Sequence, residues 1–300
     1  MSTHKRMQPA DEWTNPCEGQ VYWKWSKSLW YLAALLVTVV LAPRTATPGA
    51  VLVSFFLTVV TLCLGHTVGM HRRLIHESFA CARWLEYVLV YLGVLVGIAG
   101  PFRIIYLHDI RDWAQRHPAC NAFFIHTNSW WKDFFQQLHC DLRLAHPPRF
   151  VIEDRVRHDR FYAFLQKTWM LQQIPLALLL YFIGGAGWVV WGIGVRLLVS
   201  LTGHWLVGYL AHNHGGKTWV IQGAAVQGFN VRGFSLLTMG ENWHNNHHAF
   251  PESSRLGLKR GEWDPGWLAL KIFARCGWVW NLATPETLPP RAERVEIPLH

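Results

Sequence analysis

Residues 50–65 read AVLVSFFLTVVTLCLG, and after three further residues the stretch 69–76 reads GMHRRLIH. The first stretch supplies most of a membrane-spanning helix, since about 20 residues cross a hydrocarbon core of ~30 Å. His71 and His76 would then lie at the end of that helix, beside two arginines. Imidazole is a common ligand for transition metals, so the stretch predicts a metal site at the membrane surface.

The composition of the chain also points to a membrane. Its 300 residues are 51% hydrophobic and 16% charged, with 18 tryptophans, which lies outside the range of ordinary soluble proteins. The net charge of +9 suits anionic lipid or an acidic soluble partner, and the apolar content argues against nucleic acid. The six cysteines contain no CxxC pair, so we expect free thiols.

Four apolar segments predict an all-α bundle of four transmembrane helices with a cytoplasmic helical cap. The expected spans are residues 28–44, 50–69, 168–184 and 188–211. Residues 84–100 are expected to form a helix in the membrane interface, because a fifth crossing would put the histidine-rich segments on opposite sides. Residues 1–27 form an N-terminal segment, residues 28–282 the membrane domain, and residues 283–300 a loosely packed tail.

Basic residues are unevenly distributed around these spans. They cluster before the first span, after the second, and between residues 103 and 167. The turn at residues 43–50 carries only Arg44, and the turn at residues 184–187 carries none. By the positive-inside rule, both termini and the metal site of this multi-pass protein are expected on the cytoplasmic side.

The 17 histidines include three conspicuous groups. They are His71 with His76, His117 in the stretch WAQRH, and His244, His247 and His248 in the stretch GENWHNNHH. The third group has the spacing i, i+3, i+4, which places its rings on one helix face. The first pair has the spacing i, i+5, with four residues in between, and shares a face only if the helix ends or bends between the two histidines. Solvated surface histidines are the alternative for each group taken alone.

This pattern resembles the integral-membrane fatty acyl desaturases, in particular the stearoyl-CoA desaturase branch, from about residue 30 to residue 282. That family has boxes H-x4-H, H-x2-H-H and H-x2-H-H. The first pair matches the first box, and the third group, followed by Ala-Phe-Pro at residues 249–251, matches the third box. The resemblance implies two iron ions, O2 as co-substrate and the introduction of a cis double bond into a fatty acyl chain. Histidine ligands alone would also suit zinc or copper.

The family has one further histidine at the cytoplasmic end of its last span, and His212 corresponds to it. Four residues earlier the family carries an asparagine that reaches a metal through water. Gly208 stands at that position here, so that contact must be absent or replaced.

The second box departs from the family pattern. His117 aligns with it, but Cys120 and Asn121 stand where the next two histidines are expected. A cysteine thiolate can bind iron, although a structural role is favoured for Cys120. The remaining histidines that could substitute are His66, His108, His126, His139 and His204.

We select His108 among these, because Asp109 or Asp112 could hold its second ring nitrogen. His66 ranks lower, since it lies about 140° around an α-helix from His71, and His204 lies about 12 Å along the helix from His212. The expected metal ligands are His71, His76, His108, His117, His212, His244, His247 and His248.

The reaction implied by the resemblance needs further partners. A lipid acyl chain would enter a narrow apolar tunnel, and Arg72, Arg73 and other arginines could meet a phosphorylated head group or anionic lipid. The chain has no Rossmann glycine fingerprint, haem domain or iron–sulfur cysteine set. A separate electron donor of the ferredoxin, rubredoxin or cytochrome type, with its reductase, is therefore expected.

Two alternatives stay open from the sequence. One is a lipid hydroxylase with the same di-iron centre, since both reactions begin with removal of a hydrogen atom. The other is a non-catalytic membrane protein that binds a metal or haem.

Overall fold

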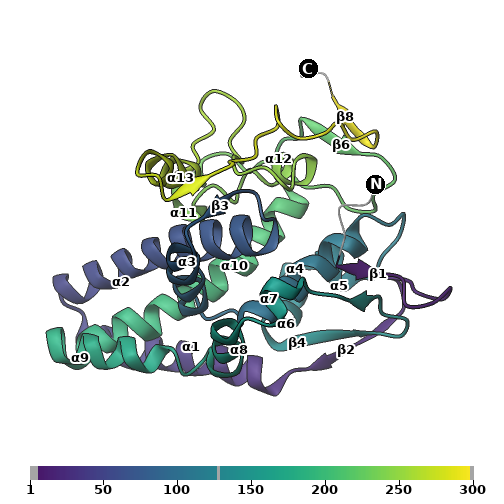
Figure 1. Cartoon of the computed structure of the whole chain (residues 1–300). Helices are drawn as coiled ribbons and strands as arrows, with labels where there is room; N and C mark the ends of the chain where they lie inside the picture. Colours follow the sequence, from purple (N-terminus) through teal and green to yellow (C-terminus); the bar gives the residue numbers. More distant parts are fainter. Residues whose placement is uncertain (1–5, 127–128, 298–300) are drawn as a thin grey trace.

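The computed structural model describes residues 6–126 and 129–297, and most of them are helical (Figure 1). Within these residues, three helical segments are long and apolar enough to cross a membrane: Trp25–Thr45, Pro48–Ile75 and Gln173–Asn213. The first is α1 (Trp25–Thr45), and the second joins α2 (Pro48–Val60) to the π-helix η1 (Thr61–Ile75). The third joins α9 (Gln173–Val189), η2 (Val190–Val195) and α10 (Arg196–Asn213).

The third segment reverses direction inside its length. Gly185 has φ 71° and ψ −167°, a conformation outside the helical region that glycine adopts at no steric cost. A Cβ atom at Gly192 would lie 2.5 Å from Leu180 Cδ1, whereas residues twelve apart in a straight helix are about 18 Å apart. The segment is therefore a helical hairpin, with its break inside the turn predicted at residues 184–187.

The helix η1 sets the direction in which its histidines point. In a π-helix each N–H bonds the carbonyl five residues earlier, as His76 N does to His71 O at 3.0 Å. Side chains five residues apart therefore lie on nearly the same face. This corrects the α-helical estimate for His66. His71 and His76 meet because of this register and because η1 ends at Ile75, between the two histidines, as the sequence analysis allowed.

The helix α3 (Arg83–Leu95) packs along η1 and belongs to the main hydrophobic core. The two backbones approach closely, since a Cβ atom at Gly69 would lie 2.5 Å from Leu89 O. Thirteen residues of α-helix are about 20 Å long, which is too short for a ~30 Å hydrocarbon core. This short helix replaces the longer interfacial helix expected at residues 84–100.

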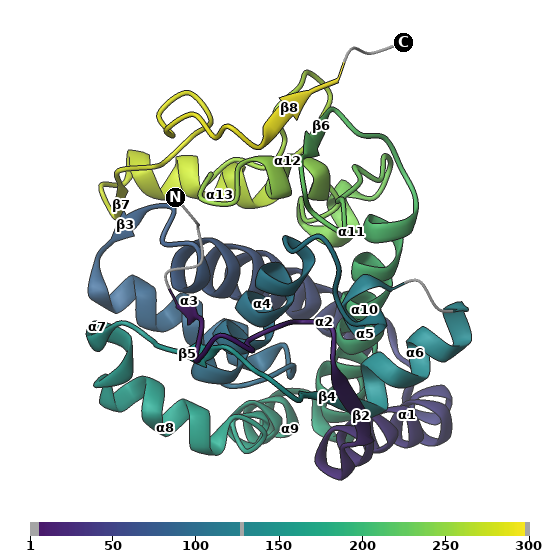
Figure 2. The same ribbon diagram turned by 90° about the vertical axis from the view of Figure 1, so that its right-hand side faces the viewer.

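The remaining helices, called the cap below, lie toward the ends of η1 and α10 that carry the histidines, away from the turn of α9 (Figures 1 and 2). They are α4 (Pro101–Gln115), α5 (Ala122–Ile125), α6 (Trp130–His139), α7 (Asp154–Arg157), α8 (Arg160–Thr168), α11 (Ser235–Thr238), α12 (His244–Ala249) and α13 (Pro265–Arg275).

Four short antiparallel strand pairs fasten the cap, and the all-α prediction did not include them. They are β1 (Met7–Gln8) with β5 (Arg149–Phe150), β2 (Gly19–Trp23) with β4 (Cys140–Leu144), β3 (Ala80–Cys81) with β7 (Val279–Trp280), and β6 (Trp219–Ile221) with β8 (Arg294–Glu296). The six cysteines all lie within the described residues and are free, as predicted.

The first and last parts of the described chain contact the cap. Arg6 is buried and donates to Ile75 O at the end of η1 at 2.8 Å. At the other end, β8 pairs with β6 beside α12, and the Arg294 guanidinium lies 4.0 Å from the centre of the Phe250 ring (Figure 2). Within the tail predicted at residues 283–300, strand pairing and this cation–π contact thus fix residues 294–296, while the other described side chains of the tail are half-buried or exposed.

Candidate metal centre

Two clusters of imidazole rings lie at the boundary between the long helices and the cap. Among the described residues, the first cluster contains His71, His76, His108 and His247, and the second contains His212, His244 and His248. Within each cluster the candidate ligand atoms all lie within 4.8 Å of one another. The rings come from four separate parts of the chain: the end of η1, α4, the end of α10, and α12. The helix α12 contributes to both clusters.

Ring nitrogens in both clusters converge in pairs. The Nε2 atoms of His76 and His108 are 3.3 Å apart in the first cluster. In the second, His244 Nε2 lies 3.2 Å from His212 Nε2 and 3.1 Å from His248 Nε2. Several imidazole nitrogens directed at one point suit a transition-metal ion.

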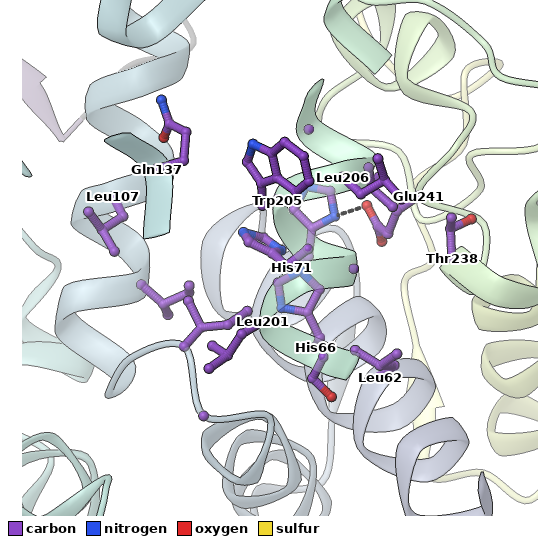
Figure 3. A pocket seen from close by; sticks show the side chains of 18 of the residues that line it. Leu62, His66, His71, Leu107, Gln137, Leu201, Trp205, Leu206, Thr238 and Glu241 are labelled. Atoms are coloured by element: carbon purple, nitrogen blue, oxygen red, sulfur yellow. Dashed lines mark ion pairs between the residues drawn. The ribbon is translucent and has the colours of Figure 1, made fainter. Parts of the chain in front are cut away.

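In three of these rings, an oxygen atom that can accept a hydrogen bond lies close to the Nδ1 atom. Asp109 Oδ1 lies 3.1 Å from His108 Nδ1, as predicted, and Gly208 O lies 2.7 Å from His212 Nδ1. Glu241 Oε2 lies 2.8 Å from His71 Nδ1, and a dashed line marks this ion pair in Figure 3. An acceptor at Nδ1 fixes the tautomer that leaves the Nε2 lone pair free for a metal.

Burial keeps the rings of α12 neutral. It lowers the pKa of His244 and His247 well below the usual value, and neighbouring histidines lower both further. Burial also lowers the pKa of His248, to about 4. Metal binding requires deprotonated imidazole, so these rings are in the competent form at neutral pH.

His117 lies outside both clusters, although the sequence pattern predicted it as a ligand. Its Nδ1 lies 2.8 Å from Trp113 O, and its ring packs against the Trp113 indole at 4.6 Å. Cys120 packs against an apolar cluster of the cap, and burial raises the pKa of its thiol to about 11. Asn121 caps α5 by accepting from Phe123 N at 3.1 Å. The structure therefore brings together seven of the eight predicted ligands.

Two histidines that ranked low in sequence lie next to the first cluster. The His66 ring stacks on His71 with centroids 6.5 Å apart, and the His204 ring meets His66 edge-on at 5.0 Å. Neither joins the metal clusters among the described residues. The π-helical register of η1 is what turns His66 toward His71.

The ring of His126 lies beside Gly208, the position at which the desaturase family carries an asparagine. A Cβ atom at Gly208 would lie 3.5 Å from His126 Nε2, and the His126 ring stacks on His212 at 5.3 Å. His126 is fixed by Asp133 Oδ2, 2.9 Å from its Nδ1, and by Arg111 Nη1, 2.8 Å from its Nε2. The absent side chain at residue 208 thus makes room for the His126 ring.

A buried ion pair joins η1 to the cap. Arg72, which is 1% exposed, donates to Asp264 Oδ1 at 2.7 Å and to Ser254 O at 2.6 Å. Asp264 also accepts from the backbone N–H of Trp267 and so caps α13. Arg73 pairs with the buried carboxylate of Glu86. Neither arginine is exposed, so the expectation that they meet a head group is wrong.

A cavity of about 1270 Å³ opens beside both clusters. Its wall includes His71, His247 and His212, and Figure 3 shows Leu62, Leu107, Leu201 and Leu206 around the same space. The cavity continues between α2 and α10 to Phe55 and Leu237, whose side chains are 66% and 70% exposed. It therefore connects the histidine clusters with an apolar outer surface.

A helical fold with membrane-length apolar helices and two imidazole clusters beside an apolar cavity is typical of a membrane protein that can bind metal ions and has room for an apolar ligand. The model of the fatty acid desaturase family matches residues 46–260. The chain is 35% identical to the sn-1 stearoyl-lipid 9-desaturase of Anabaena variabilis, over 80% of this chain and 86% of the relative. It is 34% identical to the sn-1 stearoyl-lipid 9-desaturase of Synechocystis, over 87% and 78% of the two chains.

A plant protein, Delta-9 acyl-lipid desaturase 2 of Arabidopsis thaliana, is 33% identical over 85% of this chain and 80% of its own length. The chain belongs to the fatty acid desaturase family and is an oxidoreductase. Family membership favours desaturation over the hydroxylase and the non-catalytic alternatives.

Substitution of Arg72 tests whether its ion pair with Asp264 stabilises the contact between η1 and the cap. Arg72→Met leaves the Asp264 carboxylate buried without its cation, so we expect a loss of about 3–5 kcal/mol in unfolding free energy. Arg260→Met, at an exposed arginine of the cap, should change it by less than about 0.5 kcal/mol. Denaturant unfolding of both variants in detergent checks this, and equal midpoints would contradict the role given to the pair.

Proposed function

We propose that this protein introduces a cis double bond into the acyl chain of a membrane lipid. When bound in the two histidine clusters, iron supplies the activation of O2 that removes two hydrogen atoms from adjacent methylene groups. The observation that carries the proposal is the convergence of seven imidazoles on two points beside an apolar cavity. The donor set fits iron, and family membership favours it over zinc or copper.

The side chains of this protein hold and orient the reactants. Asp109 and Glu241 fix His108 and His71, and the backbone of Gly208 fixes His212. The apolar wall of the cavity excludes water and holds one carbon–carbon unit of the chain beside the clusters. The protein thus decides which methylene groups react.

The cavity favours a substrate that stays attached to a lipid head group. Its lining reaches exposed apolar residues on α2 and beside α11, so an acyl chain could enter sideways from the bilayer while the head group stays at the surface. Relatives named stearoyl-lipid and acyl-lipid desaturases support the same choice.

We place the chain in the membrane with four crossings. The crossings are α1, α2 with the first part of η1, α9, and η2 with α10, because the third apolar segment is a hairpin. The turn at Gly185 and the connection between α1 and α2 carry little positive charge, whereas the opposite end is rich in lysine and arginine. The positive-inside rule then puts the termini, the cap and both clusters on the cytoplasmic side.

Electrons come from a separate donor in this proposal. A ferredoxin, rubredoxin or cytochrome, reduced by its own reductase, would supply two electrons per double bond. Exposed arginines on the cap offer a basic surface for a small acidic donor. They include Arg143, Arg149, Arg157 and Arg160.

Expression in a desaturase-deficient host tests the reaction. Membranes from cells with the wild-type chain should contain a new monounsaturated acyl chain, and membranes with His247→Ala should not, because that change removes an imidazole at the centre of the site. Gas chromatography with mass spectrometry of the acyl chains identifies the product. A hydroxylated chain, or no product from wild type with its donor present, would contradict the proposal.

The metal content of two variants tests the ligand assignment. His108→Ala removes a ring whose Nε2 faces His76, so the purified variant should bind iron at least about 10-fold more weakly than wild type. His117→Ala should keep the wild-type iron content, because that ring lies outside both clusters. Elemental analysis measures both, and the reverse order of the two variants would contradict the assignment.

A further inference from the structure

The helix α4 presents a row of polar side chains to both histidine clusters. His108, Asp112 and Gln115 follow at intervals of four and three residues, which places them on one helix face. His108 Nε2 lies 3.3 Å from His76 Nε2 of the first cluster. Gln115 Nε2 lies 3.2 Å from His212 Nε2 of the second. Asp112 lies between these two contacts along the helix.

The Asp112 carboxylate belongs to the same cavity as both clusters. It lines the cavity together with His108, His212 and His248. His108 belongs to the first cluster, and His212 and His248 belong to the second. The Asp112 carboxylate therefore shares one cavity with imidazoles from each cluster.

The two clusters differ in the carboxylates that contact their histidine rings. In the first cluster, Asp109 pairs with His108 and Glu241 with His71. The second cluster contains three imidazoles, and the Nδ1 atom of His212 contacts the uncharged backbone carbonyl of Gly208. A divalent ion on three neutral rings keeps its full charge in a buried site, which is costly unless an anion lies nearby.

We propose that Asp112 is the fourth protein ligand of the metal held by His212, His244 and His248. The inference rests on the proposed function only in taking iron as that metal. Both Asp112 oxygens lie 3.2 Å from Arg116 Nε. The carboxylate is not part of the second cluster, whose nitrogens lie within 4.8 Å of one another. Metal binding therefore turns one oxygen toward the ion, while the other keeps its bond to Arg116, which orients the ligand.

Three variants of the full-length chain test this assignment. Asp112→Asn keeps the shape and removes the charge, so the second iron should bind at least about 100-fold more weakly and be lost on purification. Asp112→His supplies a nitrogen ligand and should retain both irons. Arg116→Gln removes only the ion pair and should retain both irons with affinity weakened by about 10-fold at most.

The readout is iron per chain by elemental analysis and the Mössbauer spectrum of protein loaded with iron-57. Loss of one quadrupole doublet in Asp112→Asn, and its return in Asp112→His, supports the proposal. Two irons in Asp112→Asn would overturn it, and so would equal losses in Asp112→Asn and Arg116→Gln, which would assign Asp112 to the ion pair alone. None of these measurements depends on the lipid product, so failure here is distinct from failure of the proposed reaction.

Discussion

The buried contact between Arg72 of η1 and Asp264 of the cap fixes where α12 lies relative to the long helices. The position of α12 affects both clusters, because α12 supplies His247 to one and His244 and His248 to the other. The guanidinium also donates to Ser254 O, and the carboxylate caps α13, so one ion pair orients the chain that follows α12. It acts together with the ion pair between Glu241 and His71, which joins η1 to the chain just before α12.

The site combines neutral rings with a small number of carboxylates placed behind them. Burial favours the neutral form of the α12 rings, and metal binding needs that form. The carboxylates of Asp109 and Glu241 hold rings of the first cluster. Asp109 is itself paired with Arg6, so the N-terminal segment contributes to the orientation of His108. Ligand orientation thus depends on contacts between parts of the chain that are far apart in sequence.

The sequence predicted the apolar hairpins, the third histidine box and an aspartate, Asp109 or Asp112, beside His108, because each depends on local spacing. It did not predict that His66 faces His71, because that prediction assumed the 3.6-residue period of an α-helix. The helix η1 is a π-helix, and its Gly69 packs closely on α3, a tertiary contact that the sequence pattern does not reveal. His117 lies beyond the end of α4, where the chain leaves the face that carries His108. Where a helix ends depends on its tertiary contacts, so motif alignment alone could not separate these two histidines.

If both histidine clusters are iron sites, one iron ion binds in each of them. Anomalous diffraction from crystals of the iron-loaded protein, recorded on both sides of the iron absorption edge, tests this most directly. We expect two peaks, one among His71, His76, His108 and His247 and the other among His212, His244 and His248. A single peak, or a signal that appears only at the zinc edge, would contradict this expectation.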